Sequence, residues 1–286
     1  MTGRLRRIGK RLLLLASLTL VGGLLGATLV RFAPGYGVDE RELDPSLSPA
    51  TRAAIRNERQ LHTGLLSYYG VYLTNALHGD LGRSQWLDRP IASLLKERFA
   101  LTARSVSLGL LTAWAAAAFL ALLALFSRSW LLDLSGTLAS GLLVALPGAV
   151  VALLAVYLRA PVFVAISMVL FPKVFRYLRN LLEHAYGLPY VLAARARGIG
   201  GVRILFRHVL PLAAAPVAAL LGVSLSMAFG AAIPIEALCD SPGVGQLAWL
   251  AALNRDLPLI MNLTLLITLV TVAANSASDL LHERQL

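Results

Sequence analysis

The long apolar blocks of this chain restrict its fold more than any other feature of the sequence. The blocks cover approximately residues 12–30, 105–126, 132–157, 161–178, 211–235 and 258–279. An α-helix needs about 20 apolar residues to cross the hydrocarbon core of a bilayer. We therefore predict an all-α, polytopic membrane protein with six transmembrane helices. The block at 161–178 fits the pattern least well, because Pro161 and Pro172 interrupt it.

The composition agrees with a membrane protein and argues against nucleic-acid binding. Hydrophobic residues make up 57% of the 286 residues and charged residues only 14%, whereas soluble domains contain about 25% charged residues. The formal net charge of +11 comes from basic residues that cluster beside the apolar blocks, as the positive-inside rule expects. No base-reading motif accompanies them. The single cysteine, Cys239, excludes an intrachain disulfide.

The basic residues of the short loops predict the orientation. They are Arg128, Lys173, Arg176 and Arg179 on one side of the membrane, against Arg159 and Arg255 on the other. This bias places both termini and the loop 183–208 in the cytoplasm. The first block has no small-residue cleavage site after it, so we favour an uncleaved anchor over a signal peptide.

The stretch 183–211 is cationic and interrupted by glycines, and it reads EHAYGLPYVLAARARGIGGVRILFRHVLP. Two short amphipathic pieces flank a break at Gly198, Gly200 and Gly201. Glycine lets the backbone turn sharply at such a break, and Pro211 suits the first turn of the helix that follows. We predict two short helices joined by a tight turn.

The spacing of Ala193-Ala194, Gly198 and Pro211 resembles the cytoplasmic EAA loop of binding-protein-dependent ABC importer permeases, most closely those of the oligopeptide, dipeptide and nickel branch. The resemblance implies a type I ABC importer permease fold, in which this loop docks into a groove of the ATPase subunit. The residues it assigns to coupling are Ala193, Ala194, Arg195, Arg197, Gly198, Gly200, His208 and Pro211. The two alanines would permit close approach, Gly198 would permit the turn, and the first two arginines would pair with acidic ATPase residues. Leu192 stands at the glutamate of the motif, and Pro189 at a position that is often acidic.

Other stretches resemble the same family in the same order. Residues 31–35 (RFAPG) resemble the end of its first span, and residues 79–84 (GDLGRS) the end of its long first extracytoplasmic loop. After the fifth apolar block, the resemblance assigns to the outer mouth of the pore Glu236, Pro242, Gly243, Gly245, Asn254, Arg255, Asp256 and Pro258. A helix-loop-helix lying on the membrane surface is the simpler interpretation of this segment, and both can hold.

The resemblance also divides the chain. Residues 1–31 would form a cytoplasmic tail and the first helix, and 32–100 an extracytoplasmic region that helps to meet the solute-binding protein. Residues 101–286 would form a five-helix permease core with the coupling loop at about 183–208.

The chemistry of an enzyme is missing from the sequence. It contains no phosphate-binding loop, HExxH, CxxC or GxSxG motif, so we predict no catalytic residue, no metal site and no cofactor. The resemblance implies a permease subunit that forms the path for peptides or a similar small solute, with nickel, glutathione and sugars still open, and that couples to ATP hydrolysis by alternating access. Its implied partners in the bacterial inner membrane are a second permease subunit, expected to be a paralogue, two ATP-binding subunits and an extracytoplasmic solute-binding protein.

Two other classes of protein compete with this interpretation. A secondary transporter not driven by ATP is the main alternative, although such proteins usually carry ionisable residues within the membrane. Four of the six apolar blocks have essentially none, and no inverted repeat is evident. A membrane-embedded enzyme would need a polar cluster at one membrane face, and the sequence indicates none.

Overall fold

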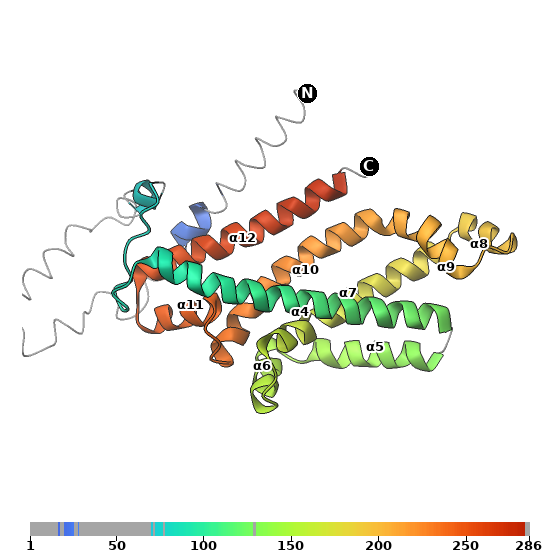
Figure 1. Cartoon of the computed structure of the whole chain (residues 1–286), viewed down its shortest axis with the longest axis horizontal. Helices are drawn as coiled ribbons and strands as arrows, with labels where there is room; N and C mark the ends of the chain where they lie inside the picture. Colours follow the sequence, from blue (N-terminus) through green and yellow to red (C-terminus); the bar gives the residue numbers. More distant parts are fainter. Residues whose placement is uncertain are drawn as a thin grey trace, which may run out of the picture. The chain divides into compact units, whose positions relative to one another are not determined.

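The computed structural model describes residues 17, 20–25, 28, 70, 72–76, 78–127 and 130–283. Within these residues the regular structure is helical, apart from an isolated bridge between Arg83 and Pro90. The long helices are α4 (Ile91–Ser127), α5 (Trp130–Ala145), α6 (Gly148–Tyr157), α7 (Val162–Tyr186), α10 (Leu210–Leu238), α11 (Val244–Leu253) and α12 (Leu257–Glu283) (Figure 1). Three short elements precede α10: α8 (Pro189–Ala196), α9 (Gly201–Ile204) and the π-helical turn η2 (Leu205–Val209). The predicted all-α class is confirmed.

Three helical stretches of the described residues are long and apolar enough to cross a membrane: Ile91–Ser127, Gly201–Leu238 and Leu257–Ser276. They contain the predicted blocks 105–126 and 211–235 and most of 258–279, so the polytopic class is confirmed as well. The predicted first span, 12–30, lies outside the described residues except for 17, 20–25 and 28. The predicted RFAPG motif also lies outside them.

The predicted span over 132–157 is not one continuous helix. The chain forms α5 and α6 instead, and the axes of Leu134–Ala145 and Gly148–Tyr157 differ by 100°. Pro147 explains the break, because it has no N–H to continue the hydrogen bonds of α5 and adopts an extended ψ of 142°. The hydropathy of the block gave no sign of the bend, since apolar residues continue through it.

The helix predicted at 161–178 has other bounds in the structure. Helix α7 runs on to Tyr186, with Pro172 inside it, and it is not among the helices whose length and composition suit a membrane crossing. One face of α7 is buried and apolar, whereas Lys173 and Arg176 are exposed on the other. The hydrophobicity of α7 therefore serves packing within the protein more than contact with lipid.

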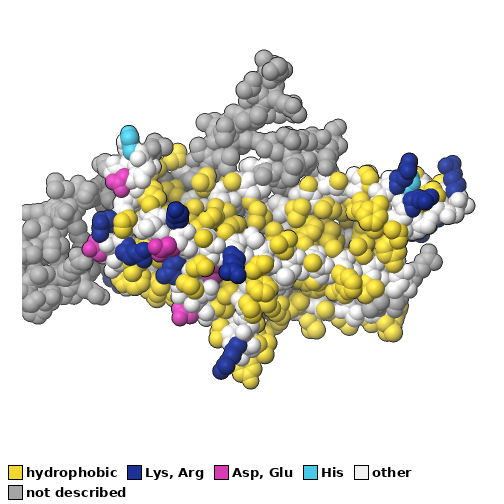
Figure 2. Space-filling model, in the orientation of Figure 1, with side chains coloured by type: hydrophobic (Ala, Val, Ile, Leu, Met, Phe, Trp, Pro, Cys, Tyr) yellow, Lys and Arg dark blue, Asp and Glu magenta, His cyan; other side chains and the backbone are white. Residues whose placement is uncertain are grey.

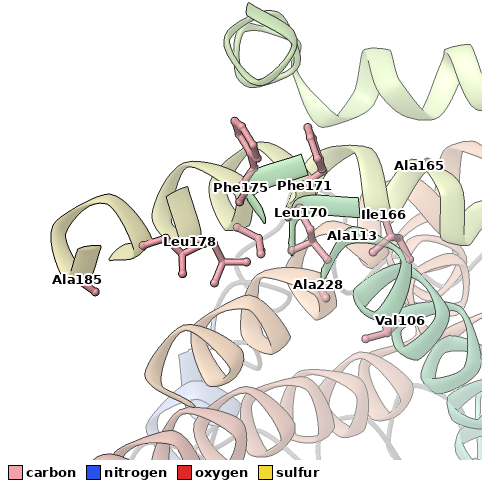
Figure 3. Packing of buried hydrophobic residues seen from close by; sticks show 14 of the residues in the cluster. Val106, Ala113, Ala165, Ile166, Leu170, Phe171, Phe175, Leu178, Ala185 and Ala228 are labelled. Carbon is pink, nitrogen blue, oxygen red and sulfur yellow. The ribbon is translucent and has the colours of Figure 1, made fainter. Parts of the chain in front are cut away.

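The chain forms two compact units, residues 1–98 with 247–269 and residues 99–246 with 270–286. In the second unit, α7 packs against α5, α6 and α10, and Figure 3 shows Ile166 and Leu170 of this helix within the buried cluster. Gly136 of α5 lies close to the ring of Phe175 of α7. A Cβ atom on Gly136 would lie 2.6 Å from its Cζ atom, so only glycine fits there without a shift.

The first unit has a smaller core around the N-terminal half of α12. Leu257 and Met261 are buried there, and Leu24 and Leu73 pack against them. A Cβ atom on Gly22 would lie 3.1 Å from the Thr268 Oγ1 atom. The absence of a side chain at Gly22 therefore allows the stretch 20–25 to lie close to α12.

Candidate functional site

Helix α8 forms the first half of the predicted coupling segment, and both of its ends follow from the sequence. Pro189 occupies the first turn, where the missing N–H of proline is not needed. After the helix, Gly198 adopts a left-handed φ of 77°. Its N–H donates to the Arg195 carbonyl at 2.9 Å, and the N–H of Ile199 donates to the Ala194 carbonyl at 3.2 Å. This pair of bonds is the Schellman motif, which ends a helix with glycine in the left-handed position.

The inner face of α8 is fixed to the end of α7 and the start of α9. Val191 and Ala194 are buried. The Tyr186 hydroxyl donates to the Gly201 carbonyl at 3.1 Å, and the Arg195 guanidinium lies 5.0 Å from the centroid of the same tyrosine ring. Burial raises the pKa of Tyr186 and the Arg195 cation lowers it by less, so the hydroxyl remains a donor at neutral pH.

A π-helical turn, η2, joins α9 to α10. It covers Leu205–Val209, and Pro211 follows in the first turn of α10. In a regular α-helix the proline ring would meet the carbonyl of Arg207. A π turn places one more residue in the turn and widens the backbone at this point. The turn therefore lets proline stand near the start of α10 without ending the helix.

The outer face of the segment 189–209 carries large apolar side chains that this chain does not cover. Phe206 is 66% exposed and Val202 61%, and Tyr190 and Leu192 are exposed as well. The exposed arginines of the segment are Arg195, Arg197, Arg203 and Arg207. Figure 2 shows Lys and Arg side chains gathered over α8 and α9. We call this set of apolar and basic side chains the coupling surface; surfaces of this kind mark interaction sites.

The predicted coupling residues are placed unequally on this segment. Ala193 is exposed on the coupling surface, whereas Ala194 is buried beneath it. Gly198 needs its left-handed backbone, but Gly200 has an ordinary φ of −64° as the residue before α9. No atom lies within 4 Å of where a Cβ would be on Gly200. His208 is half-buried, with its ring 6.4 Å from that of Tyr190.

In the second unit, the predicted outer-mouth segment is organised by the buried carboxyl group of Glu236. Its Oε2 atom accepts from the Gly245 N–H at 2.8 Å and from the Thr102 hydroxyl at 3.0 Å. The same hydroxyl oxygen accepts from the Val244 N–H at 2.8 Å. The first two N–H groups of α11 thereby find partners, one on α10 and one on α4, and α11 is tied to both helices.

The glycines of this segment are required by close packing. A Cβ atom on Gly243 would lie 2.1 Å from the Glu236 Oε2 atom, and one on Gly245 would lie 2.5 Å from the backbone of Ile233. The backbone cannot move aside as a flexible side chain can. Pro242, directly before Gly243, is exposed. The motif resembling the outer mouth is therefore a tight turn closed over a carboxyl group.

In the first unit, Asp256 organises the remaining part of the predicted segment. Its side chain precedes α12 and accepts from the Leu259 N–H at 3.1 Å, which caps the helix. Its second oxygen accepts from the Ser84 hydroxyl at 2.5 Å and from the Trp86 N–H at 3.1 Å. Asp256 and Ser84 are both 1% exposed. The GDLGRS motif is thus bound to the start of α12.

A second polar link joins the same two stretches. The Tyr72 hydroxyl donates to the Asn262 Oδ1 atom at 2.7 Å, and the amide nitrogen of Asn262 donates to the Leu81 carbonyl at 3.1 Å. The carbonyl of Pro258 accepts from the same Asn262 amide nitrogen at 2.8 Å. The end of the predicted extracytoplasmic region is therefore part of the first unit's structure.

The last two predicted outer-mouth residues, Asn254 and Arg255, lie at the end of α11. The Asn254 amide bonds the Leu250 carbonyl at 2.8 Å, and Arg255 has a left-handed φ of 54°. The N–H of Arg255 donates to the Ala252 carbonyl, and that of Asp256 donates to the Ala251 carbonyl. This is again a Schellman motif, here with arginine in the position that favours glycine.

Sequence reasoning missed the hydroxyl partners of the two carboxyl groups. Thr102 lies 134 residues before Glu236, and Ser84 lies 172 residues before Asp256. Neither residue type is unusual in its local sequence, and no periodicity links the members of each pair. The only available signal was that two acidic residues, Glu236 and Asp256, stand beside apolar blocks and need buried partners.

Known proteins resemble the chain over nearly its full length. Residues 105–285, more than half of the chain, match the family described as "Binding-protein-dependent transport system inner membrane component". The oligopeptide transport system permease proteins OppB of Salmonella typhimurium and Escherichia coli are each 27% identical, with 89% of both chains aligned. A Brucella suis protein with the words peptide permease in its name is 27% identical, with 95% of both chains aligned.

These matches confirm the family that the coupling-loop motif suggested, and they leave the secondary-transporter alternative without support. They also agree with a subunit that does not itself hydrolyse ATP, since its relatives are named as permease components. The chain belongs to the inner-membrane permease components of binding-protein-dependent ABC importers, of the oligopeptide type.

Proposed function

We propose that this permease subunit forms half of the path for short peptides and receives the force of ATP binding through the segment 183–208. The names of its relatives support peptides as the solute. The proposed assembly contains a second, paralogous permease subunit, two ATP-binding subunits and an extracytoplasmic solute-binding protein. Both termini and the coupling surface lie in the cytoplasm in this proposal, as the distribution of basic loop residues suggests.

The observation that carries the coupling proposal is the exposure of Leu192, Val202 and Phe206 on the segment 189–209. The Schellman end of α8 and the packing of Val191 fix its shape from within. Exposed apolar side chains of this size are unfavourable in water, so a partner that covers them gains binding energy. The neighbouring arginines suit an acidic groove.

In the proposed mechanism, the coupling surface moves as one body with the ATPase groove into which it docks. Closure of the ATPase dimer on ATP displaces α8 and α9, and η2 connects this movement to α10. The path then opens to the outside, and hydrolysis resets it. ATP acts by binding one of two conformations more tightly than the other. The outer-mouth segment around Glu236 belongs to the part of the permease that opens.

The first test is the recovery of ATPase subunits with the permease from detergent-solubilised membranes. The variant Ala193→Asp adds a carboxylate on the coupling surface without disturbing the core, because Ala193 is exposed. Gly200→Ala is the matched control, since its new methyl group meets no atom. Wild type and the control should recover the ATPase and Ala193→Asp should not. Equal recovery with Ala193→Asp would show that the dock lies elsewhere.

The second test addresses the solute. Proteoliposomes that contain the whole complex and its binding protein should import trialanine when ATP is supplied on the side of the membrane that the ATPase subunits face. If the complex imports a solute of another class and no trialanine, the peptide proposal is rejected, and the proposal that the chain is part of an importer is retained.

A further inference from the structure

Helix α8 is joined to its neighbours through glycines at both ends. Gly187 lies between α7 and α8, and Gly198 and Gly200 lie between α8 and α9. Glycine has no Cβ atom to restrict its backbone, so the chain bends most easily at these three positions. The backbone hydrogen bonds of the stretch 187–200 span at most five positions. They shape α8 and its turns, but they do not join the two ends of the stretch.

One side chain joins these two ends. Tyr186 stands directly before the stretch 187–200, and Gly201 stands directly after it. The Tyr186 hydroxyl donates to the Gly201 carbonyl at 3.1 Å, across 15 positions of the sequence. Tyr186 is 6% exposed, and a hydrogen bond in the protein interior is stronger than one in water. Among the described residues, this bond closes the stretch 187–200 into a loop that contains α8.

Arg195, in the last turn of α8, packs on the same tyrosine. Its guanidinium carbon lies 5.0 Å from the centroid of the Tyr186 ring, within the roughly 6 Å over which a cation is attracted to an aromatic face. The contact holds the end of α8 on the residue that closes the loop. Among the described residues, Arg197, Arg203 and Arg207 have no ion pair or ring contact. They are therefore available to a partner protein in a way that Arg195 is not.

The loop also closes against the end of α4. A Cβ atom on Gly201 would lie 3.2 Å from the Phe126 Cε1 atom, so the first residue of α9 lies directly against this ring. Gly201 meets the Tyr186 side chain of α7 through its carbonyl group and the Phe126 side chain of α4 through its Cα atom. Gly201 is thus the point where the ends of α7 and α4 meet the start of α9.

We propose that Tyr186 is a positioning residue for the coupling of the ATPase to the permease, and that Arg195 acts through it. This inference rests on the proposed function, in which an ATPase subunit displaces α8. With the loop closed, the displacement of α8 moves the end of α7 and the start of α9 together. Without the Tyr186 hydroxyl, the three glycines let α8 tilt by itself, and less of the displacement reaches α10. Docking uses the exposed side chains of the coupling surface and does not need this bond.

The first test measures whether Tyr186 holds the loop closed. Cys239→Ser removes the single native thiol, and nitroxide labels are attached at Asn180→Cys on α7 and Ala196→Cys on α8, which are both exposed positions. Pulsed electron paramagnetic resonance on the detergent-purified subunit gives the distribution of distances between the labels. The distribution should broaden in Tyr186→Phe and broaden further in Tyr186→Leu. Tyr177→Phe, which removes a hydroxyl from an exposed tyrosine of α7, should leave it unchanged. A distribution in Tyr186→Leu as narrow as in wild type would overturn the proposal.

The second test measures coupling in the whole complex, as the rate of ATP hydrolysis with the solute-binding protein divided by the rate without it. In the proposed assembly these two proteins act on opposite sides of the membrane, so the ratio reports transmission through the permease. Tyr186→Phe should lower the ratio about fivefold, the factor that one neutral hydrogen bond contributes to an equilibrium, and Tyr177→Phe should not. Both variants should still recover the ATPase subunits. An unchanged ratio in Tyr186→Phe, or loss of the ATPase from it, would overturn the role assigned to Tyr186.

A double-mutant cycle tests the role of Arg195. Arg195→Gln should lower the same ratio in an otherwise wild-type subunit. It should have little further effect in a Tyr186→Leu subunit, because the two residues act through one contact. Arg195→Lys should retain most of the ratio, since lysine also places a cation over the ring. Arg197→Gln provides the comparison and should act equally in both backgrounds. If Arg195→Gln also acts equally in both, Arg195 pairs with the ATPase, and the part of the proposal that concerns it is wrong.

These measurements also separate failure of this inference from failure of the proposed function. A wild-type complex that recovers no ATPase, or whose ATP hydrolysis does not respond to the binding protein, would reject the coupling role of the segment 183–208 and with it that of Tyr186. The label distances would still decide whether Tyr186 closes the loop. The identity of the solute enters neither measurement.

Discussion

The coupling segment and the outer-mouth segment keep their shapes by different means. The segment 189–209 relies on backbone caps and on small buried side chains, and its large apolar side chains point outward. The segment around Glu236 is closed on itself, with a buried carboxyl group whose hydrogen-bond partners all come from its own unit. The first leaves large apolar side chains that this chain does not cover, whereas the second has its polar groups paired within the chain.

This difference indicates which substitutions affect folding of the subunit and which affect its assembly with other subunits. Removing a buried hydrogen-bond acceptor leaves donors unsatisfied in the isolated subunit. Changing an exposed apolar residue alters only what another protein meets. Stability of the free subunit and recovery of its partners should therefore respond to different residues.

The largest effect is expected for Glu236→Ala. It leaves the Thr102 hydroxyl and the Gly245 N–H without their acceptor and should lower the free energy of unfolding by roughly 3 kcal/mol. Glu236→Gln keeps one side-chain oxygen and should lose less. Thermal unfolding of the detergent-purified subunit measures both. If the alanine variant is as stable as wild type, this carboxyl group does not hold the outer-mouth segment, and the proposed difference between the two segments is wrong.

Asp256→Ala should have the next largest effect, roughly 2 kcal/mol, since it removes a helix cap and the acceptor of Ser84. Ser84→Ala leaves the helix cap intact, removes its bond to Asp256 and the acceptor of the Leu87 N–H, and should lower stability by about 1 kcal/mol. The same unfolding assay applies. A larger loss for the serine variant than for the aspartate variant would contradict the cap.

Gly198→Ala tests the coupling segment against Gly200→Ala. The first forces a side chain into a left-handed backbone, at about 1 kcal/mol, and the second does not. We expect reduced recovery of the ATPase only for Gly198→Ala, with little change in thermal stability. Equal behaviour of the two variants would mean that the turn geometry is irrelevant to docking.

Arg255→Gly should stabilise the subunit slightly, by about 0.5 kcal/mol, because glycine adopts the left-handed φ without the steric cost of a side chain. Arg159→Gly, at a φ of 52° after α6, provides a second case. Melting temperatures of both variants should rise. A fall in both would show that contacts of the arginine side chains outweigh the backbone strain.

The smallest expected effect concerns the reactivity of the Cys239 thiol. Burial raises the pKa of the Cys239 thiol, which also donates to the Ala152 carbonyl at 3.6 Å. The thiolate fraction at a given pH is therefore below that of a free cysteine, and alkylation at pH 8 should be slow and should still accelerate above pH 9. A rate like that of free cysteine would indicate that this end of α10 is open to solvent.

The sequence allowed the helices and the caps to be predicted better than their contacts. α10 and α12 could be located because a bilayer requires long uninterrupted apolar runs, and the end of α8 because only glycine turns there without strain. The bend at Pro147 could not be predicted, because apolar residues continue on both sides of it. The pairing of Thr102 with Glu236 could not either, since nothing local distinguishes one threonine from another.

The link between Ser84 and Asp256 also sets an order of events during synthesis. The two residues are 172 positions apart, and ribosomes add about 5–20 residues per second, so Ser84 is made roughly 10–30 s before its partner. Tyr72 waits even longer for Asn262, which is 190 positions away. The first unit therefore reaches its final form only when the last helix has been made, and a chain truncated before α12 leaves these polar groups without their native acceptors.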